Sequence, residues 1–172
     1  MKNLAFLAFP EQAELLISEL AGRFGITQKP DARYGDLLYF ENLALPEGQF
    51  PYWTRTVMLE PFFVKFNSIG EAAAELKKLQ RNWAPYQYTC FRRAQLIQEK
   101  LPYINLKERS FPVKIPNSPM GLYTLIDEHT MIASAATTST LPAGTLHFIE
   151  DHENPPSRAY LKIQESLTMA NL

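Results

Sequence analysis

The sequence predicts an α+β fold in which helices cover an antiparallel sheet. Two observations indicate this class. In the first half of the chain, short apolar runs typical of strands alternate with amphipathic stretches of helical period. In the second half, prolines separate further short strand candidates. The 172 residues, 46% of them hydrophobic, suffice for one large domain or two compact ones, and no run reaches the roughly 20 apolar residues of a membrane helix.

The N-terminal elements are expected in the order strand, helix, strand, strand. Residues 4–9 are entirely apolar, which is typical of a strand buried on both faces. Residues 11–25 carry apolar side chains at helical spacing. Residues 36–42 have strand composition, and so do residues 52–66, where Pro61 indicates a bulge or a sheet edge.

A second helix and a fourth strand complete this first unit. Ser68 and Glu71 match a capping box at the start of the helix. Residues 83–89 form the next strand candidate. The order strand, helix, strand, strand, helix, strand is the ferredoxin-like pattern, so we expect a ferredoxin-like domain over residues 1–82. The second helix should bury four residues: Ala72, Leu76, Leu79 and Trp83.

A strand-rich module is expected over residues 83–150. A third helix should span residues 90–101, followed by strands at 121–126, 131–136 and 145–150. The polar, proline-ended stretch that follows is typical of a linker. The apolar stripe of the third helix should contain Cys90, Ala94, Ile97 and Leu101.

The charge distribution indicates one basic region. The net charge is −1, so nothing attracts the whole molecule to nucleic acid. Between Glu75 and Glu99, however, the chain contains no acidic residue. Cations beside aromatic side chains are the means by which proteins contact RNA phosphates and stack on bases, although such aromatics also serve as core residues beside a solvated helix face. The candidate RNA-binding cations are Lys77, Lys78, Arg81, Arg92 and Arg93.

Other chemistry finds little support in the residue pattern. Cys90 is the only cysteine, which fits a reducing compartment such as the cytoplasm, and its apolar helical position favours a core residue over a nucleophile. His147 and Asp151 would lie about 13 Å apart in a strand, too far for one metal ion. Asp127 and Glu128 are adjacent and would point to opposite faces. No glycine-rich nucleotide motif is present.

The closing stretch begins a helix with Ser157 as N-cap. Arg158 and Lys162 lie one turn apart near its N-terminus, where two cations repel each other and oppose the helix dipole. Local stability does not explain this choice, whereas binding to phosphate or hydroxyl groups would. The expected buried stripe consists of Tyr160, Ile163 and Leu167.

The segment SRAYLKI, residues 157–163, resembles the entry to the FtsJ-like ribose 2'-O-methyltransferases, where Ser-Arg-Ala/Ser-x-x-Lys-Leu opens the catalytic domain. Residues 155–167, taken with the module before them, are similar to the RlmM-like enzymes that methylate cytidine in large-subunit rRNA. Ile163 in place of leucine departs from the pattern. The resemblance implies a ferredoxin-like and a THUMP-like RNA-binding region ahead of the catalytic domain, and therefore assigns residues 83–150 to the THUMP-like module.

The resemblance also implies functional residues and partners. It places the first lysine of a Lys, Asp, Lys, Glu catalytic tetrad at Lys162 and adds Arg158 to the RNA-binding residues. The other three tetrad members and the loop for S-adenosylmethionine have no counterpart, so residues 151–172 are expected to be a linker and the first helix of a truncated methyltransferase domain. We expect no cofactor binding and no activity from this chain alone. The implied partners are large-subunit rRNA and the methyltransferase domain of the same polypeptide.

Two alternatives remain. The chain is a complete, non-catalytic α+β module that binds a protein or small ligand, and in that case the closing helix should pack on the domain and bury its apolar stripe. Alternatively, it is a small hydrolase that uses His129 or His147, although no nucleophile follows either histidine at a recognisable spacing.

Overall fold

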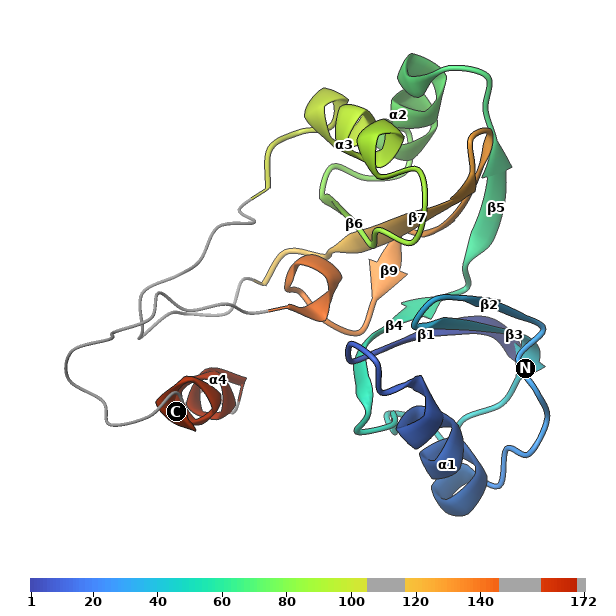
Figure 1. Cartoon of the computed structure of the whole chain (residues 1–172), viewed down its shortest axis with the longest axis vertical. Coiled ribbons are helices and arrows are strands. Elements are labelled where there is room, and N and C mark those ends of the chain that lie inside the picture. The colour runs from blue at the N-terminus through green and yellow to red at the C-terminus, as the bar shows by residue number, and fades with distance from the viewer. Residues whose placement is uncertain (105–116, 146–158, 170–172) are drawn as a thin grey trace.

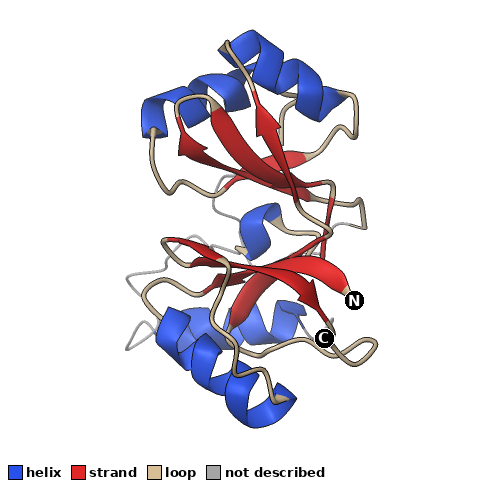
Figure 2. Cartoon of the chain, turned by 90° about the vertical axis from the view of Figure 1, so that its right-hand side faces the viewer, coloured by secondary structure: helices blue, strands red, loops and turns tan. Residues whose placement is uncertain are grey.

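Two β-sheets stacked face to face form the centre of the molecule, with helices on both outer sides (Figure 2). The computed structural model describes residues 1–104, 117–145 and 159–169. Helix α1 (Ala13–Phe24) covers the outer face of the first sheet, and helices α2 (Ile69–Lys77) and α3 (Phe91–Lys100) cover that of the second. The expected α+β class is confirmed.

The first sheet is antiparallel throughout and has β1 at its centre. Its order places β9, the last strand within the described ranges, beside β4, so a segment from the second half of the sequence lies at one edge. In spatial order the strands are β2 (Ala32–Tyr34), β3 (Leu37–Leu43), β1 (Lys2–Ala8), β4 (Thr54–Leu59) and β9 (Ala136–Thr137).

The second sheet contains one parallel pair, β6 with β7, and is otherwise antiparallel. Helix α2 leads from β5 to β6 and helix α3 from β6 towards β7 (Figure 1). The strands are, in order, β5 (Phe62–Lys65), β8 (Thr130–Ser134), β7 (Gly121–Asp127) and β6 (Trp83–Pro85). A 3₁₀ turn, η1 (Pro142–Gly144), and helix α4 (Ala159–Met169) complete the described elements.

Strand β1 is buried on both faces, as its unbroken apolar run predicts. Phe6 belongs to the cluster under α1, whereas its neighbours Ala5 and Leu7 belong to a cluster that includes Leu122 of β7 and Ile132 of β8. Successive side chains of a strand point to opposite faces. The apolar layer between the sheets is therefore built from every second residue of the central strands.

The apolar core between the second sheet and helices α2 and α3, called the outer core of the second sheet, contains most of the residues expected to be buried there, with one exception. Trp83 is fully buried, and its indole N–H donates to the carbonyl oxygens of Leu76 and Gln80, both at 3.0 Å. Leu79 was expected in the core but is 53% exposed, because α2 ends at Lys77 and the chain then turns away. The expected residues that do enter this core are Ala72, Leu76, Ala94, Ile97 and Leu101.

The distribution of elements differs from the single ferredoxin-like sheet expected over residues 1–82. The expected strand at 52–66 is two strands, β4 and β5, which lie in different sheets. Between them Glu60 has a left-handed backbone (φ 49°), and Pro61 has no N–H with which to continue the ladder. Helix α2 consequently packs on the second sheet, and β6 is one of its strands. The domain boundary expected at residue 82 therefore falls within the unit formed by the second sheet and its helices. The strand expected at 145–150 lies almost wholly outside the described residues.

The shared layer predicts that the two sheets unfold together. We expect Leu7→Ala, a change in the first sheet, to lower the free energy of unfolding by about 2–5 kcal/mol, the usual range for truncating a buried leucine. In a Trp53→Phe background the fluorescence of Trp83 reports the second sheet, and its urea midpoint should fall with the mutation. Leu79→Ala is the exposed control and should shift stability by no more than about 0.5 kcal/mol. An unchanged Trp83 midpoint in Leu7→Ala would show that the sheets unfold independently.

Candidate functional site

The basic region forms part of the outer helical layer of the second sheet. Ser68 Oγ accepts a hydrogen bond from the Glu71 amide at 3.1 Å, as the expected capping box requires at the start of α2. The Glu71 carboxylate accepts from the amide of Asn67 at 3.1 Å, the residue before the N-cap, rather than from the amide of Ser68 itself. Cys90 is the N-cap of α3 in a left-handed conformation (φ 53°) and is half-buried against the outer core. The cations therefore lie at the end of α2, in the loop after it and in the first turn of α3.

The five cations separate into two groups. The amide of Gln98 donates to the Trp83 carbonyl at 3.1 Å, which places the C-terminal end of α3 beside that of α2. Between Arg92 and Gln98, α3 spans about 9 Å at about 1.5 Å per residue. The α2 C-terminal group, Lys77, Lys78 and Arg81, is thus about two helical turns from the α3 N-terminal group, Arg92 and Arg93.

Arg93 has a structural role. Its Nε donates to the Glu128 carbonyl at 2.6 Å and its Nη2 to the Asn67 carbonyl at 3.5 Å. Its guanidinium also lies 5.6 Å from the ring centroid of Phe66. These contacts tie α3 to the turn between β7 and β8 and to the segment before α2, so two of the five N–H donors of Arg93 hold the fold together and fix the position of its guanidinium.

Three of the five cations are free to meet an anion. Lys78 forms an exposed ion pair with Glu75 at 2.9 Å. Lys77, Arg81 and Arg92 are exposed and make no hydrogen bond or ion pair with any residue in the described part of the chain. An exposed cation without an acidic neighbour keeps its full charge for a phosphate.

The aromatic residues of this region divide between core and surface. Trp83 is buried and cannot stack on a base. Phe91 is 58% exposed and precedes Arg92 in the first turn of α3. Tyr88 is 39% exposed and packs edge to face on Tyr34, with ring centroids 5.8 Å apart. Phe91, next to Arg92, and Tyr88, in the loop before α3, are therefore the exposed rings of this region that an unpaired base can reach.

Helix α4 contains the expected catalytic lysine. Lys162 lies in this helix, but its side chain, that of Tyr160 and the whole of Arg158 are outside the described residues. Ile163 is 61% and Leu167 37% exposed, so the expectation that they form a buried stripe is wrong. None of the core clusters formed by described residues includes a residue of α4.

The histidine of the hydrolase alternative stabilises a hairpin. His129 Nδ1 lies 3.1 Å from the Phe66 carbonyl oxygen, and the Asp127 carboxylate accepts a hydrogen bond from the His129 amide at 2.8 Å, which lowers the pKa of Asp127. The open cleft of about 570 Å³ around them is lined by neither serine nor cysteine. His147 and Asp151 are outside the described residues, and among those described no three His, Cys, Asp or Glu residues gather as a metal site would need.

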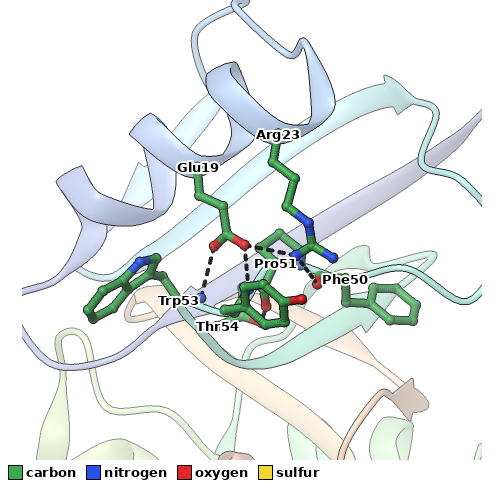
Figure 3. Close-up of polar contacts among 7 residues, drawn as sticks. Glu19, Arg23, Phe50, Pro51, Trp53 and Thr54 are labelled. Carbon is green, nitrogen blue, oxygen red and sulfur yellow. Dashed lines mark hydrogen bonds and ion pairs between the residues drawn. The ribbon is translucent and has the colours of Figure 1, made fainter.

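A polar cluster on α1 escaped the sequence analysis (Figure 3). The Glu19 carboxylate is only 9% exposed and accepts hydrogen bonds from the amides of Tyr52 at 2.7 Å and Trp53 at 3.0 Å, and from Arg23 at 3.0 Å. Burial raises the pKa of Glu19, but these hydrogen bonds outweigh it and the net pKa is lowered. The Arg23 guanidinium lies 4.1 Å from the Tyr52 ring centroid and donates to the Phe50 carbonyl. The cluster holds Tyr52 and Trp53, 77% and 41% exposed, in a fixed loop.

The position of Glu19 explains why the sequence did not reveal it. Glu19 and Arg23 stand four residues apart, which indicates only an ordinary helix-surface ion pair. The acceptor role of Glu19 depends on two backbone amides more than thirty residues away. Backbone amides carry no sequence signal.

No family model matches this chain, and no curated protein does either. The helices in the described ranges are all too short or too polar to cross a bilayer.

The Glu19 cluster predicts an acid-sensitive contribution to stability. Because the folded pKa of Glu19 is lowered from its ordinary 4.5, the ionised carboxylate stabilises the fold above that value, and the contribution is lost as the pH falls through the folded pKa. Glu19→Gln should lower the free energy of unfolding at pH 7 by about 1.5–3 kcal/mol, the range for hydrogen bonds to a charged group.

Urea unfolding between pH 7 and pH 3.5 checks this prediction. The difference between the native protein and Glu19→Gln should shrink towards the acid end. Glu14→Gln on the same helix is the matched control, since its carboxylate is 79% exposed and pairs only with Arg33, and it should have little effect at either pH. A Glu19→Gln difference that stays constant with pH would contradict the assigned role.

Proposed function

We propose that this chain is the RNA-recognition region of an S-adenosylmethionine-dependent rRNA 2'-O-ribose methyltransferase. It positions large-subunit rRNA in the cytoplasm for a catalytic domain of the same polypeptide. The observation that carries the proposal is the set of exposed, unpaired cations Lys77, Arg81 and Arg92 on an acid-free stretch, beside the exposed ring of Phe91. The Ser-Arg-Ala-x-x-Lys segment before and within α4 supplies the link to ribose methylation.

The two groups of cations suit a structured RNA better than a single short strand. Phosphate contacts fix the position of an RNA without reading its sequence, whereas aromatic rings stack on bases that are not paired. Lys77 and Arg81 would contact phosphates at one end of the helix pair, and Arg92 would do so at the other. Phe91 and Tyr88 would receive an unpaired base next to Arg92.

The exposed apolar side chains of α4 are consistent with a further domain that would cover them. Ile163 and Leu167 present apolar side chains to solvent, whereas a helix that belonged to the two-sheet body would bury them. In the proposed enzyme Lys162 helps to orient and deprotonate the ribose hydroxyl. A lysine at its ordinary pKa is a poor base at neutral pH, so this role requires further residues from the catalytic domain.

S-adenosylmethionine does not fit the residues described. Nucleoside cofactors of this size are held by a glycine-rich turn between a strand and a helix. None of the connections that lead directly from a described strand to a described α-helix, residues 9–12, 66–68 and 86–90, contains a glycine. The cofactor is therefore assigned to the catalytic domain of the parent protein.

The alternative, a non-catalytic binding module, has one observation in its favour. Tyr52 and Trp53 are exposed and fixed by Glu19, and rigid aromatic residues of this kind often dominate the binding energy of protein interfaces. A module of this kind would bind a protein through the loop before β4, which carries Tyr52 and Trp53, and would not need the basic residues of α2 and α3.

The RNA contact predicts a salt dependence that differs among the arginines. Removing one phosphate contact flattens the slope of log affinity against log salt by about 0.7–0.9. We expect Lys77→Gln, Arg81→Gln and Arg92→Gln each to do so in titrations with large-subunit rRNA fragments. Arg93→Gln, the neighbour of Arg92, should instead lower the unfolding midpoint and leave the slope unchanged, because its donors already bind backbone carbonyls.

Two controls accompany this titration. Lys2→Gln, on the first sheet, removes a cation of the same charge outside the basic region and should change neither the RNA affinity nor its salt slope. Phe91→Ala should weaken binding without altering the slope, since stacking releases no counterions. If Lys77→Gln, Arg81→Gln and Arg92→Gln all leave the slope unchanged, the basic region does not bind RNA. The non-catalytic binding module is then the better supported function.

A further inference from the structure

A half-open apolar cavity of about 490 Å³ lies beside α1 on the outer face of the first sheet. Its wall consists of Ile17, Leu20 and Ala21 from α1, Phe40 from β3 and Ile26. The cavity exists because α1 alone covers a five-stranded sheet, since the second helix expected there packs on the other sheet instead. Its volume is within the roughly 300–1,000 Å³ typical of small-molecule pockets.

The segment that follows α1, residues 26–30, forms the side of the cavity that the helix and sheet do not form, and the way α1 ends fixes its course. Gly25 has a left-handed conformation (φ 69°), its amide donates to the Ala21 carbonyl at 3.2 Å, and the Ile26 amide donates to the Leu20 carbonyl at 2.9 Å. This Schellman-type ending turns the chain back along the helix. The Asp31 amide then donates to the Tyr39 carbonyl at 2.8 Å, which fixes the far end of the segment to β3. The cavity is therefore held open by backbone hydrogen bonds at both ends.

The mouth of the cavity is positively charged. Lys29 and Arg33 line it together with Thr27, Gln28 and Pro30, and no lining residue is acidic. Arg33 forms an exposed ion pair with Glu14 at 2.9 Å. The acidic Asp31 does not line the cavity, and its carboxylate accepts a hydrogen bond from the Glu41 amide at 2.7 Å. Lys29 lines the cavity, is exposed and has no ion pair or hydrogen bond among the described residues, so its ammonium group is available beside the apolar wall.

We propose that this cavity binds a small amphipathic anion, with the apolar body against Phe40 and Ile17 and a carboxylate at Lys29. An apolar body matches the wall, and an anionic head group would pair with the exposed ammonium of Lys29. The site is independent of the proposed RNA contact, because it lies on the other sheet. An uncharged or cationic ligand of equal length would leave Lys29 without a partner.

Calorimetric titration of the whole chain with decanoate tests the proposal, with decanol and decyltrimethylammonium as matched probes below their micellar concentrations. We expect saturable binding of one decanoate, weaker binding of decanol and the weakest binding of the cation. Affinity should rise about fourfold for each methylene from octanoate to decanoate, the gain expected when a CH₂ leaves water. Equal affinities for the three head groups, or no saturable binding of decanoate at millimolar concentration, would overturn it.

Two variants locate the site. Ala21→Trp places a bulky side chain at the wall and should reduce decanoate affinity at least tenfold, whereas Ala74→Trp, at an exposed alanine of α2, should not. Lys29→Gln should weaken decanoate severalfold and leave decanol unchanged, with Lys65→Gln as control. In the unmodified protein, decanoate should shift the methyl resonances of Ile17 and Ile26, a readout that does not depend on any variant folding. Unshifted methyls, or full affinity in Ala21→Trp, would place binding elsewhere and refute the assignment.

Discussion

The packing of two sheets against each other controls the rest of this structure. Ala5, Leu7 and Met58 from the first sheet share one apolar cluster with Leu122 and Ile132 from the second. Each sheet thus has an inner face that no helix can cover, and all of α1, α2 and α3 must lie on the outside (Figure 2). Because the central strands are buried on both faces, most charged side chains lie on the outer helices, the edge strands and the loops, whereas Arg55 of β4 is half-buried in an interior strand.

This arrangement determines which surfaces of the molecule are available to bind a partner or ligand. The second sheet has α2 and α3 over its outer face, and these helices and the loop after α2 carry three exposed cations without an ion pair among the described residues: Lys77, Arg81 and Arg92. The first sheet has only α1. On one side of α1 the loop before β4 is fastened by Glu19 and Arg23, and on the other side the sheet stays uncovered and leaves the apolar cavity. The loop before β4 and the cavity thus lie on either side of the one described helix that covers the first sheet.

Neighbouring residues of the same type have different roles here, and only their contacts separate them. Arg92 and Arg93 are adjacent cations in one helical turn. Arg93 faces the carbonyl groups of Asn67 and Glu128 and joins three segments, whereas Arg92 faces solvent. In the same way Trp83 is fully buried, as expected for a residue under the second helix, and Phe91 is mostly exposed, although both belong to the same basic and aromatic stretch. A basic and aromatic composition thus identifies a region and overestimates the number of residues that can bind.

The sequence by itself determined the types of most elements, because hydrophobic period and capping are local properties. The double-sided burial of β1, the capping box at Ser68 and the stripe through Ala94 and Ile97 all follow from residues close together in the chain. Tertiary structure decided which sheet each element joins, since β4 and β5 have the same strand composition and only Glu60 and Pro61 direct them apart. Tertiary structure also decided which groups bind Glu19, because its carboxylate accepts hydrogen bonds from backbone amides of a loop that is distant in the sequence. Periodicity reports which face of an element is apolar, and it carries no information about what will cover that face.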